Sequence, residues 1–239
     1  MKAIILAAGQ GTRLRPLTYG IPKALLPVGG RPVIDYVIDT IKKCKKIDEI
    51  VIGVSHMRNS IESYIKNTRD DVDIRIVNTM ELEAGGDLKL IAASLDLKEA
   101  FLVAYGDLVT DLDVNKLVEF HDKEKGLATI GLFKVPWEDV HRFGIVELEN
   151  DYIKSFIEKP PRNKATSNIA HCGYYVLEPE VLDRLPLKKI KLEHGLFSEL
   201  AREGKLRGVV LNPKVWVDIG SYHSYLRANK LAEKLLPPE

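Results

Sequence analysis

The chain has 239 residues, of which 45% are hydrophobic and 29% charged, and its formal net charge is +1. This composition is typical of a globular protein with a substantial core, and the near-neutral charge does not support nucleic-acid or membrane partners. The two cysteines, Cys44 and Cys172, lack metal-type spacing and suit a reducing compartment, so we expect a cytoplasmic protein without a signal peptide or membrane span.

The first half of the chain alternates apolar strands with amphipathic helices. We predict strands at Lys2–Ala8, Glu49–Val54, Ile74–Val77 and Phe101–Tyr105, and helices at Val33–Lys46, Asn59–Asn67, Asp87–Leu95 and Val114–Lys125. This alternation predicts an α/β fold with a Rossmann-like, mostly parallel mixed sheet flanked by helices on both faces. Ligands of such sheets bind beyond the carboxyl ends of the strands.

The first predicted strand ends in a glycine-rich turn that is followed by cations. Gly9 and Gly11 let backbone N–H groups approach an anion, and Arg13 and Lys23 supply positive charge for phosphate. The dinucleotide fingerprint requires a third glycine where this chain has Leu14, and the Gly-Lys-Ser/Thr of a P-loop is absent around Lys23. The turn therefore predicts a phosphate-binding loop of neither class, with a solvated turn as the alternative.

Carboxylates follow two of the apolar strands. Asp107 comes after Phe101–Tyr105 and Gly106, and Asp218 follows a strand that ends at Trp216–Val217. Mg²⁺ commonly takes one or two protein carboxylates and leaves its other positions to phosphates and water. The pair therefore predicts a Mg²⁺ site facing the phosphate loop, and a turn or helix-entry aspartate is the alternative for each residue.

The second half of the chain is richer in strands with short connections. We predict strands at Ala128–Val135, Gly144–Glu149, Tyr152–Ile157, Gly173–Leu177 and Leu206–Leu211, a hairpin turn at Asn150–Asp151, and helices at Pro179–Leu185, His194–Glu203 and Tyr222–Leu236. The simplest organisation is one domain over residues 1–239, with a nucleotide-binding half (1–127) and a smaller, β-rich half for a second substrate (128–239).

Three further motifs carry polar groups that suit a sugar or a base. Glu158 and Lys159 precede a proline pair, so a stiff strand end presents one acceptor for sugar hydroxyls and one cation for a second phosphate. Glu83–Asp87 contains two glycines that allow close approach to a base or sugar. The alternative for Glu158 and Lys159 is an ordinary charged strand end, and the alternative for Glu83–Asp87 is a helix N-terminal turn. His171 is interpreted as a satisfied, half-buried strand residue rather than a metal ligand.

Together these motifs resemble the sugar-1-phosphate nucleotidyltransferase family over essentially the whole chain. The signature is Gly9-x-Gly11-Thr12-Arg13-Leu14-x-Pro16-Leu17-Thr18, then Pro22-Lys23-Ala24-Leu25-Leu26-Pro27-Val28, with Gly106-Asp107, Phe143-Gly144, Glu158-Lys159-Pro160 and Trp216-Val217-Asp218-Ile219-Gly220 in the family's order. The resemblance implies the nucleotide-diphospho-sugar transferase fold. It also implies a reaction in which an NTP and a sugar 1-phosphate give an NDP-sugar and pyrophosphate.

The resemblance also implies roles for individual residues. Arg13 would bind the triphosphate and stabilise the departing pyrophosphate, Lys23 would contact the α-phosphate region, and Asp107 and Asp218 would hold Mg²⁺. Lys159, the third catalytic cation, would position the sugar phosphate. The nucleotide-binding residues would be Leu6, Ala7, Ala8, Gly9, Gly11, Thr12, Glu83, Gly85 and Gly86. The sugar-phosphate-binding residues would be Gly144, Glu158, Lys159 and His171.

Two segments depart from the family's usual sequence and bear on substrate identity. Glu83-Ala84-Gly85-Gly86-Asp87 replaces Leu-Gly-Thr-Ala-Gly and is similar to the Glu-Thr-Gly-Gly-Gly loop of uridylyltransferases that act on N-acetylmuramic acid 1-phosphate. His171-Cys172-Gly173-Tyr174-Tyr175 replaces Asn-Ala-Gly-(Ile/Val)-Tyr. We expect UTP or dTTP as the nucleotide and leave the sugar open. The chain ends after the transferase region, so no second activity is expected.

Two other functions are compatible with parts of this pattern. A non-catalytic, nucleotide-binding regulatory relative would have the same fold, but the presence of Arg13, Lys23, Asp107 and Asp218 favours an enzyme. A nicotinamide oxidoreductase is disfavoured by Leu14 at the third glycine position. The sequence does not set the oligomeric state, and a homo-oligomer is compatible with it.

Overall fold

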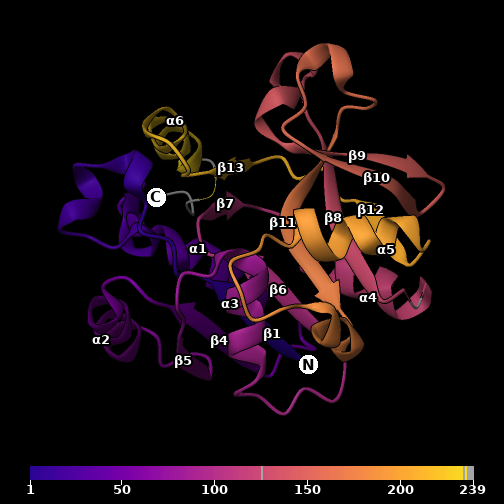
Figure 1. Cartoon of the computed structure of the whole chain (residues 1–239). Coiled ribbons are helices and arrows are strands. Elements are labelled where there is room, and N and C mark those ends of the chain that lie inside the picture. The colour runs from indigo at the N-terminus through magenta and orange to yellow at the C-terminus, as the bar shows by residue number, and fades with distance from the viewer. Residues whose placement is uncertain (125, 234, 236–239) are drawn as a thin grey trace.

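The computed structural model describes residues 1–124, 126–233 and 235. The main sheet contains β1 (Lys2–Leu6), β4 (Glu49–Val54), β5 (Ile74–Asn78), β6 (Phe101–Tyr105), β8 (Ala128–Lys134), β9 (Gly144–Glu149), β10 (Tyr152–Glu158), β11 (Ile169–Leu177) and β12 (Leu206–Val210). Their order across the sheet is β5-β4-β1-β6-β11-β8-β12-β10-β9 (Figure 1). Two short pairs complete the strands: β2 (Pro27–Val28) with β3 (Arg31–Pro32), and β7 (Leu108–Thr110) with β13 (Trp216–Asp218).

The sheet changes character along this order. The strands β5, β4, β1 and β6 are parallel, as the strand–helix alternation predicts. Next to them β11 runs antiparallel to both β6 and β8, β12 is parallel to β8, and β10 is antiparallel to β12 and β9. The predicted α/β fold with a mixed sheet is confirmed, and one sheet carries strands from both halves of the chain.

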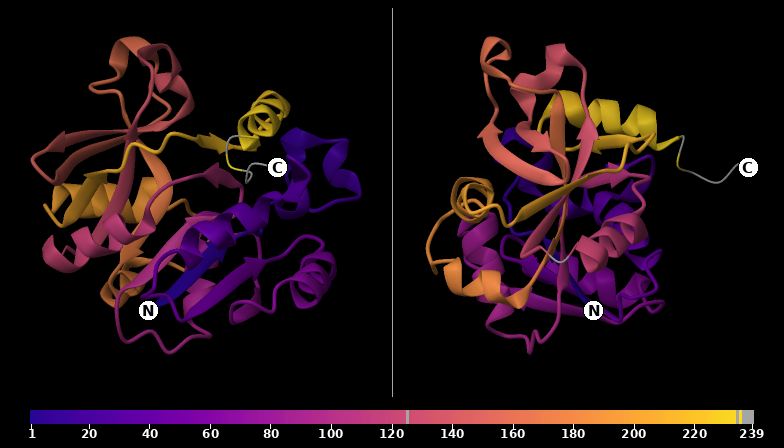
Figure 2. Two further views of the ribbon diagram at one scale, coloured as in Figure 1. Left: turned by 180° about the vertical axis from the view of Figure 1, so that it is seen from behind. Right: turned by 90° about the vertical axis from the view of Figure 1, so that its right-hand side faces the viewer.

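Helices cover both faces of the sheet (Figure 2). The core on one face contains residues of α1 (Val33–Lys42), α2 (Arg58–Thr68) and α4 (Val114–Glu124), and the core on the other contains residues of α3 (Glu83–Ala92) and α5 (Ser198–Arg202). Because strand side chains alternate, Ala3 and Ile5 of β1 join the first core and Ile4 joins the second. A third cluster packs α6 (Tyr222–Ala232) against the segment that contains Leu14 and Leu26.

Short helical turns make up much of the remaining chain. They are the 3₁₀ turns η1 (Thr12–Leu14), η2 (Leu17–Tyr19), η3 (Lys23–Leu25), η4 (Trp137–Arg142), η5 (Arg162–Lys164) and η6 (Pro179–Arg184), and the π-helical turn η7 (Glu193–Phe197). The connections that contain η4 and η5 touch one another and protrude together at the top of Figure 1.

Several predicted boundaries are wrong. Strand β1 stops at Leu6 and helix α1 at Lys42, whereas α3 begins at Glu83 rather than Asp87. The last difference arises because Asp87 Oδ1 accepts hydrogen bonds from the N–H groups of Met80 (3.3 Å) and Leu82 (3.0 Å). Asp87 therefore lies within the helix, and its carboxylate stabilises the turn that precedes the helix. The predicted helix ends at Lys125 and Leu236 lie outside the described residues.

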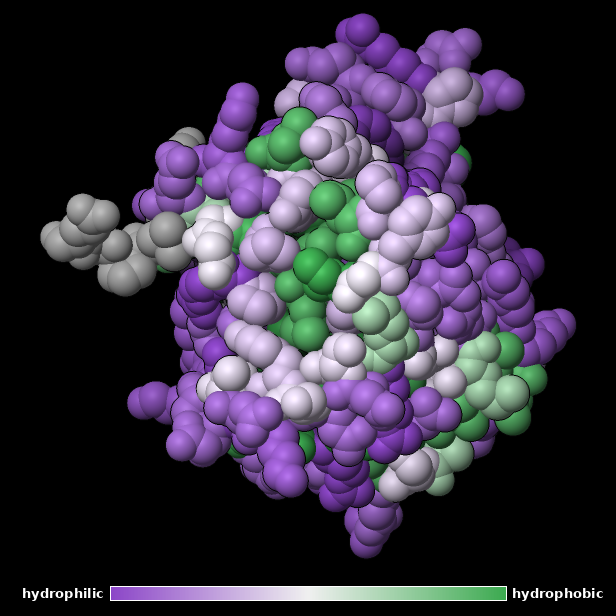
Figure 3. Space-filling model, turned by 90° about the vertical axis from the view of Figure 1, so that its left-hand side faces the viewer, coloured by the Kyte–Doolittle hydropathy of each residue, from purple (hydrophilic) through white to green (hydrophobic). Residues whose placement is uncertain are grey.

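The face of the molecule shown in Figure 3 is mainly polar. On the face shown in Figure 3, apolar side chains gather in a hollow near the centre and polar side chains surround it. Across the described residues, no helix is long and apolar enough to cross a membrane.

Candidate functional site

A cavity of about 650 Å³ lies where the carboxyl ends of β1 and β6 face β9, β10 and β11. Its lining comes from both halves of the chain. Most residues predicted from the sequence line it: Leu6, Ala7, Ala8, Gly9, Gly11, Thr12, Arg13, Lys23, Glu83, Asp107, Gly144, Glu158, Lys159, His171 and Asp218. The two predicted residues that do not line it are Gly85 and Gly86.

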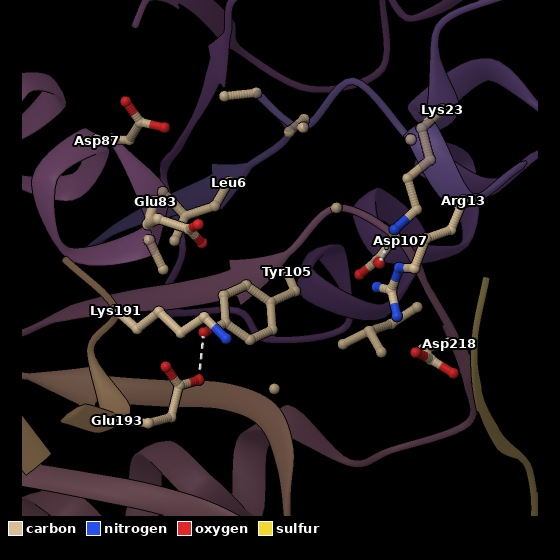
Figure 4. Close-up of a pocket in the computed structure, with 18 of the residues that line it drawn as sticks. Leu6, Arg13, Lys23, Glu83, Asp87, Tyr105, Asp107, Lys191, Glu193 and Asp218 are labelled. Carbon is tan, nitrogen blue, oxygen red and sulfur yellow. Dashed lines mark hydrogen bonds and ion pairs between the residues drawn. The ribbon is translucent and has the colours of Figure 1, made fainter. Parts of the chain in front are cut away.

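Contacts within the predicted phosphate-binding loop hold it in a compact conformation. Gly11 has φ of 65°, which favours glycine, and its carbonyl accepts a hydrogen bond of 2.8 Å from Thr18 Oγ1. A Cβ at Gly11 would lie 2.9 Å from Thr18 Cγ2 and 3.1 Å from Lys23 Cβ. This close packing places Arg13 and Lys23 on neighbouring turns, and both side chains point toward Asp107 in Figure 4.

The two predicted carboxylates lie together because β7 pairs with β13. Asp218 is opposite Leu108 in this ladder, and the Ile219 N–H donates to the Asp107 carbonyl at 3.0 Å. The Lys23 ammonium group forms an ion pair with the Asp107 carboxylate. Burial and the nearby Asp107 carboxylate raise the pKa of Asp218, although Lys23, Arg142 and Arg13 act in the opposite direction.

This carboxylate pair fits Mg²⁺. No cluster of three or more His, Cys, Asp or Glu residues suited to a metal ion is found among the described residues, so Asp107 and Asp218 would form a two-carboxylate site. Two carboxylate oxygens are a normal protein contribution to a Mg²⁺ ion that also binds phosphates and water. Burial first, and then the neighbouring Asp107 carboxylate, disfavour the charged form of Asp218, and a bound cation would offset both effects.

The Glu83–Asp87 segment differs from its predicted form. It is the first part of α3 rather than an open loop, and Gly85 and Gly86 are buried against a neighbouring segment. The Gly85 N–H donates to the Ile190 carbonyl at 2.9 Å, and a Cβ at Gly86 would overlap the Lys188 carbonyl oxygen. These glycines therefore allow close packing of two protein segments, and only Glu83, Ala84 and Asp87 of this segment reach the cavity.

The second half of the chain brings Glu158 and Lys159 to the cavity beside Gly144. Glu158 pairs with Gly144 in the β9–β10 ladder, and the Lys159 N–H donates to the Phe143 carbonyl at 3.0 Å. Lys159 has φ of 48°, an uncommon value for a residue with a Cβ, and such conformations cluster at functional sites. Its ammonium group lies 3.4 Å from Glu158 Oε1, so the two side chains share one edge of the cavity.

His171 lines the cavity with its ring held in place. Its Nδ1 is 2.8 Å from the Tyr175 hydroxyl, and its ring stacks on that of Tyr175 with centroids 6.0 Å apart. Burial lowers the pKa of His171, so the neutral ring is favoured.

The cavity also contains polar residues that the sequence analysis missed. The Tyr105 hydroxyl donates to Glu193 Oε1 at 2.6 Å, and Lys191 lies beside them in Figure 4. Burial and Glu193 raise the pKa of Tyr105 well above its usual range, so it remains a donor. Glu193 follows no strand or glycine motif, so nothing local identified it. Tyr105 directly precedes Gly106-Asp107, and that position at a strand's carboxyl end was an available signal.

Glu81, Arg142 and Lys189 are further charged residues of the cavity that were missed. Arg142, Lys189 and Lys191 line the cavity, and together with Arg13, Lys23 and Lys159 they distribute positive charge around it. The arrangement has phosphate-binding chemistry between β1 and β6, and a second set of cations and acceptors on the side of β9–β11. It can hold two anionic substrates next to each other.

The chain is similar in sequence to known proteins over most of its length. A family model described as "Nucleotidyl transferase" matches residues 2–234. The chain is 34% identical over 242 residues to the "UTP--glucose-1-phosphate uridylyltransferase" of Synechocystis sp., which covers 95% of this chain and 62% of that protein. It is 32% identical over 238 residues to the "Probable mannose-1-phosphate guanylyltransferase 1" of Oryza sativa subsp. japonica, covering 97% and 64%. The chain thus spans less than two thirds of the length of these relatives.

Solved structures share the fold. A putative glucose-1-phosphate thymidylyltransferase from Bacillus anthracis, in complex with a sucrose, superposes with a TM-score of 0.87 at 27% identity, covering 100% of this chain and 98% of that one. An apo UDP-glucose pyrophosphorylase superposes with a TM-score of 0.84 at 23% identity, covering 98% of each chain.

Proposed function

The chain belongs to the nucleotidyl transferase family, and from that premise we propose that it joins an NTP and a sugar 1-phosphate to give an NDP-sugar and pyrophosphate. One observation carries the proposal. Arg13, Lys23, Asp107 and Asp218, on the nucleotide side, line the same cavity as Lys159 and its neighbours from the second half of the chain.

The chemistry needs positioning more than proton transfer. An oxygen of the sugar phosphate forms a bond to the α-phosphorus of the NTP, and the bond from that phosphorus to the bridging oxygen breaks, so pyrophosphate leaves with the electron pair. The attacking oxygen is already anionic, so a general base is unnecessary. The protein has to hold two polyanions in line and offset their repulsion, which fixed cations in a partly buried site do well.

The residues divide this task between them. We assign Arg13 to the β- and γ-phosphates and to the charge that develops on pyrophosphate, Lys23 to the α-phosphate, and Lys159 to the sugar phosphate. Glu158 is an acceptor for a sugar hydroxyl. Asp107 and Asp218 would hold Mg²⁺, which when bound neutralises phosphate charge.

The substrates are proposed at a finer level. The similarity of the Glu83–Gly86 sequence to a uridylyltransferase loop favours UTP or dTTP, and a relative named as a guanylyltransferase makes GTP the main competitor.

Both cysteines are buried free thiols, which supports a cytoplasmic site of action.

A pyrophosphate-release assay tests the proposal. UTP, dTTP, GTP, ATP and CTP are each combined with a panel of sugar 1-phosphates in the presence of Mg²⁺. We expect turnover with at least one pair, and loss of that turnover in Arg13→Ala and Asp107→Ala while both variants keep a cooperative thermal transition. Glu180→Gln, an exposed carboxylate on η6, is the matched control and should behave as the wild type. Nucleotide binding without turnover of any pair would instead indicate a regulatory relative.

A further inference from the structure

Arg142, like Lys189 and Lys191, is a cavity cation to which neither the sequence motifs nor the assignments above give a role. It ends η4, in the protruding connection before β9, and its side chain is 29% exposed. The nearest carboxylate, Asp139 on the same turn, lies 3.5 Å from Arg142 Nη1, which is at the outer limit of a hydrogen bond. The guanidinium group is therefore held only loosely within the protein, yet it lines the cavity.

An aromatic cluster lies next to the guanidinium group of this arginine. The guanidinium carbon lies 5.5 Å from the centroid of the Phe143 ring, within cation–π range. Phe143 meets Trp216 edge to face at 5.5 Å, and Phe133 completes the cluster at 4.6 Å from Trp216. The Trp216 indole N–H donates to the Cys172 carbonyl at 2.9 Å, so the whole stack is tied to β11.

This cluster joins Arg142 to both substrate sides of the cavity. Trp216 lies in β13 two residues before Asp218, and the positive charge of Arg142 acts on the Asp218 carboxylate. The Phe143 carbonyl accepts a hydrogen bond from the Lys159 N–H, and Phe143 directly precedes Gly144. Arg142 and Lys159 therefore enter the cavity from adjacent strand ends, at the edge nearest the carboxylate pair.

We propose that Arg142 is a catalytic residue that binds the phosphate group of the sugar 1-phosphate together with Lys159, an inference that rests on the proposed function. A guanidinium group can donate two parallel hydrogen bonds to phosphate oxygens, and an ammonium group adds a point charge. The pair holds the attacking phosphate against the α-phosphate, which Arg13 and Lys23 contact. It also offsets the repulsion between the two anions as they approach.

The test separates binding of the sugar phosphate from binding of the nucleotide. In Arg142→Gln we expect kcat/KM for the sugar 1-phosphate to fall by about 10²–10³-fold, as on removal of a single charge-stabilising donor. Nucleotide affinity, measured by calorimetry without the sugar phosphate, should stay within about twofold of the wild type. Arg142→Lys should recover part of the loss, because it keeps the charge but not the bidentate geometry.

Two control variants exclude a structural explanation. Asp139→Asn removes the intraturn ion pair and should leave kcat/KM unchanged; a loss equal to that of Arg142→Gln would show that the Arg142–Asp139 contact matters, and would overturn the proposal. Arg162→Gln removes an exposed arginine from η5 in the same protruding region and should also be neutral. Retention of more than a tenth of kcat/KM in Arg142→Gln, or a parallel loss of nucleotide affinity, would likewise overturn it.

The proposed function and this inference can fail separately. If the wild type releases no pyrophosphate with any substrate pair, the proposed function fails, and calorimetry with glucose 1-phosphate as the probe then decides the role of Arg142. Weaker binding of glucose 1-phosphate to Arg142→Gln than to wild type and Asp139→Asn supports a phosphate contact. Equal affinity in all three proteins refutes it.

Discussion

Replacing Gly86 with alanine tests whether this glycine serves packing rather than the base. The added Cβ would overlap the Lys188 carbonyl oxygen and lie 2.5 Å from Leu82 Cβ. Neither neighbour is free to move, because the Ile190 N–H donates to the Leu82 carbonyl at 3.0 Å and pins the two segments together. Overpacking against backbone costs about 1–3 kcal/mol. The gain from replacing a helical glycine, about 0.5–1 kcal/mol, offsets only part of that.

We therefore expect Gly86→Ala to lose about 1–2 kcal/mol of unfolding free energy, which is a Tm lower by roughly 2–8 °C for a protein of this size. Urea unfolding and a thermal scan measure it. Gly20→Ala is the matched control, since a Cβ there meets nothing within 4 Å, and its stability should change by less than about 0.5 kcal/mol. A Gly86→Ala protein as stable as the wild type but unable to bind nucleotide would refute the packing argument and restore the base-contact interpretation.

Two further predictions concern the ionisable groups of the cavity. The folded-state pKa of Asp218 is raised by burial and Asp107, so ionisation of this carboxyl group opposes folding as pH rises through that value. Asp218→Asn should therefore raise the Tm of the metal-free protein at pH 7, and in an EDTA-buffered series this gain should shrink as the pH falls toward 4. The same variant should abolish Mg²⁺-dependent pyrophosphate release. An equal or lower Tm at pH 7 would contradict this sign. Tyr105→Phe removes the hydrogen bond to Glu193, so we expect about 1–3 kcal/mol less stability and a raised KM for the sugar 1-phosphate at unchanged nucleotide affinity. An unchanged KM in steady-state kinetics would show that Glu193 does not need this donor for its part in the cavity.

The phosphate side of the site was predictable because its signals are local. The apolar run before Gly9 and the apolar run before Asp107 each predict a buried strand. The carboxyl ends of parallel strands meet at one edge of a sheet. Strands β1 and β6 are indeed direct neighbours in the sheet. Placement of Arg13, Lys23 and Asp107 around one cavity follows from that adjacency and from the short distance along the chain between each side chain and its strand.

The rest depended on contacts between distant segments. The pair of Asp107 and Asp218 was predicted from two separate motifs, but the ladder that brings them together was not, because β7 and β13 have three residues each and are too short to show a periodic pattern. Glu193 reaches Tyr105 across 88 positions of sequence, from a π-helical turn without a motif. The Gly85-Gly86 pair, predicted to bind nucleotide, is not among the cavity-lining residues for a related reason: glycine permits close approach, but the sequence does not say whether a ligand or another segment, here residues 188–190, makes that approach.

The ion pair between Lys23 and Asp107 connects the two chemical tasks of the site. Carboxylates that suit a cation repel phosphates, so a cavity with both needs a neighbouring positive charge while no substrate is present. Lys23 supplies it to Asp107, whereas Asp218 has no ion-pair partner among the described residues, and burial together with the Asp107 carboxylate raises its pKa. In the proposed reaction, the ammonium group would exchange one anionic partner for another when phosphate oxygens arrive, so little charge pairing would be lost. A lysine suits this exchange, because its charge is compact and its stem flexible, whereas the fork of an arginine would hold the carboxylate more firmly.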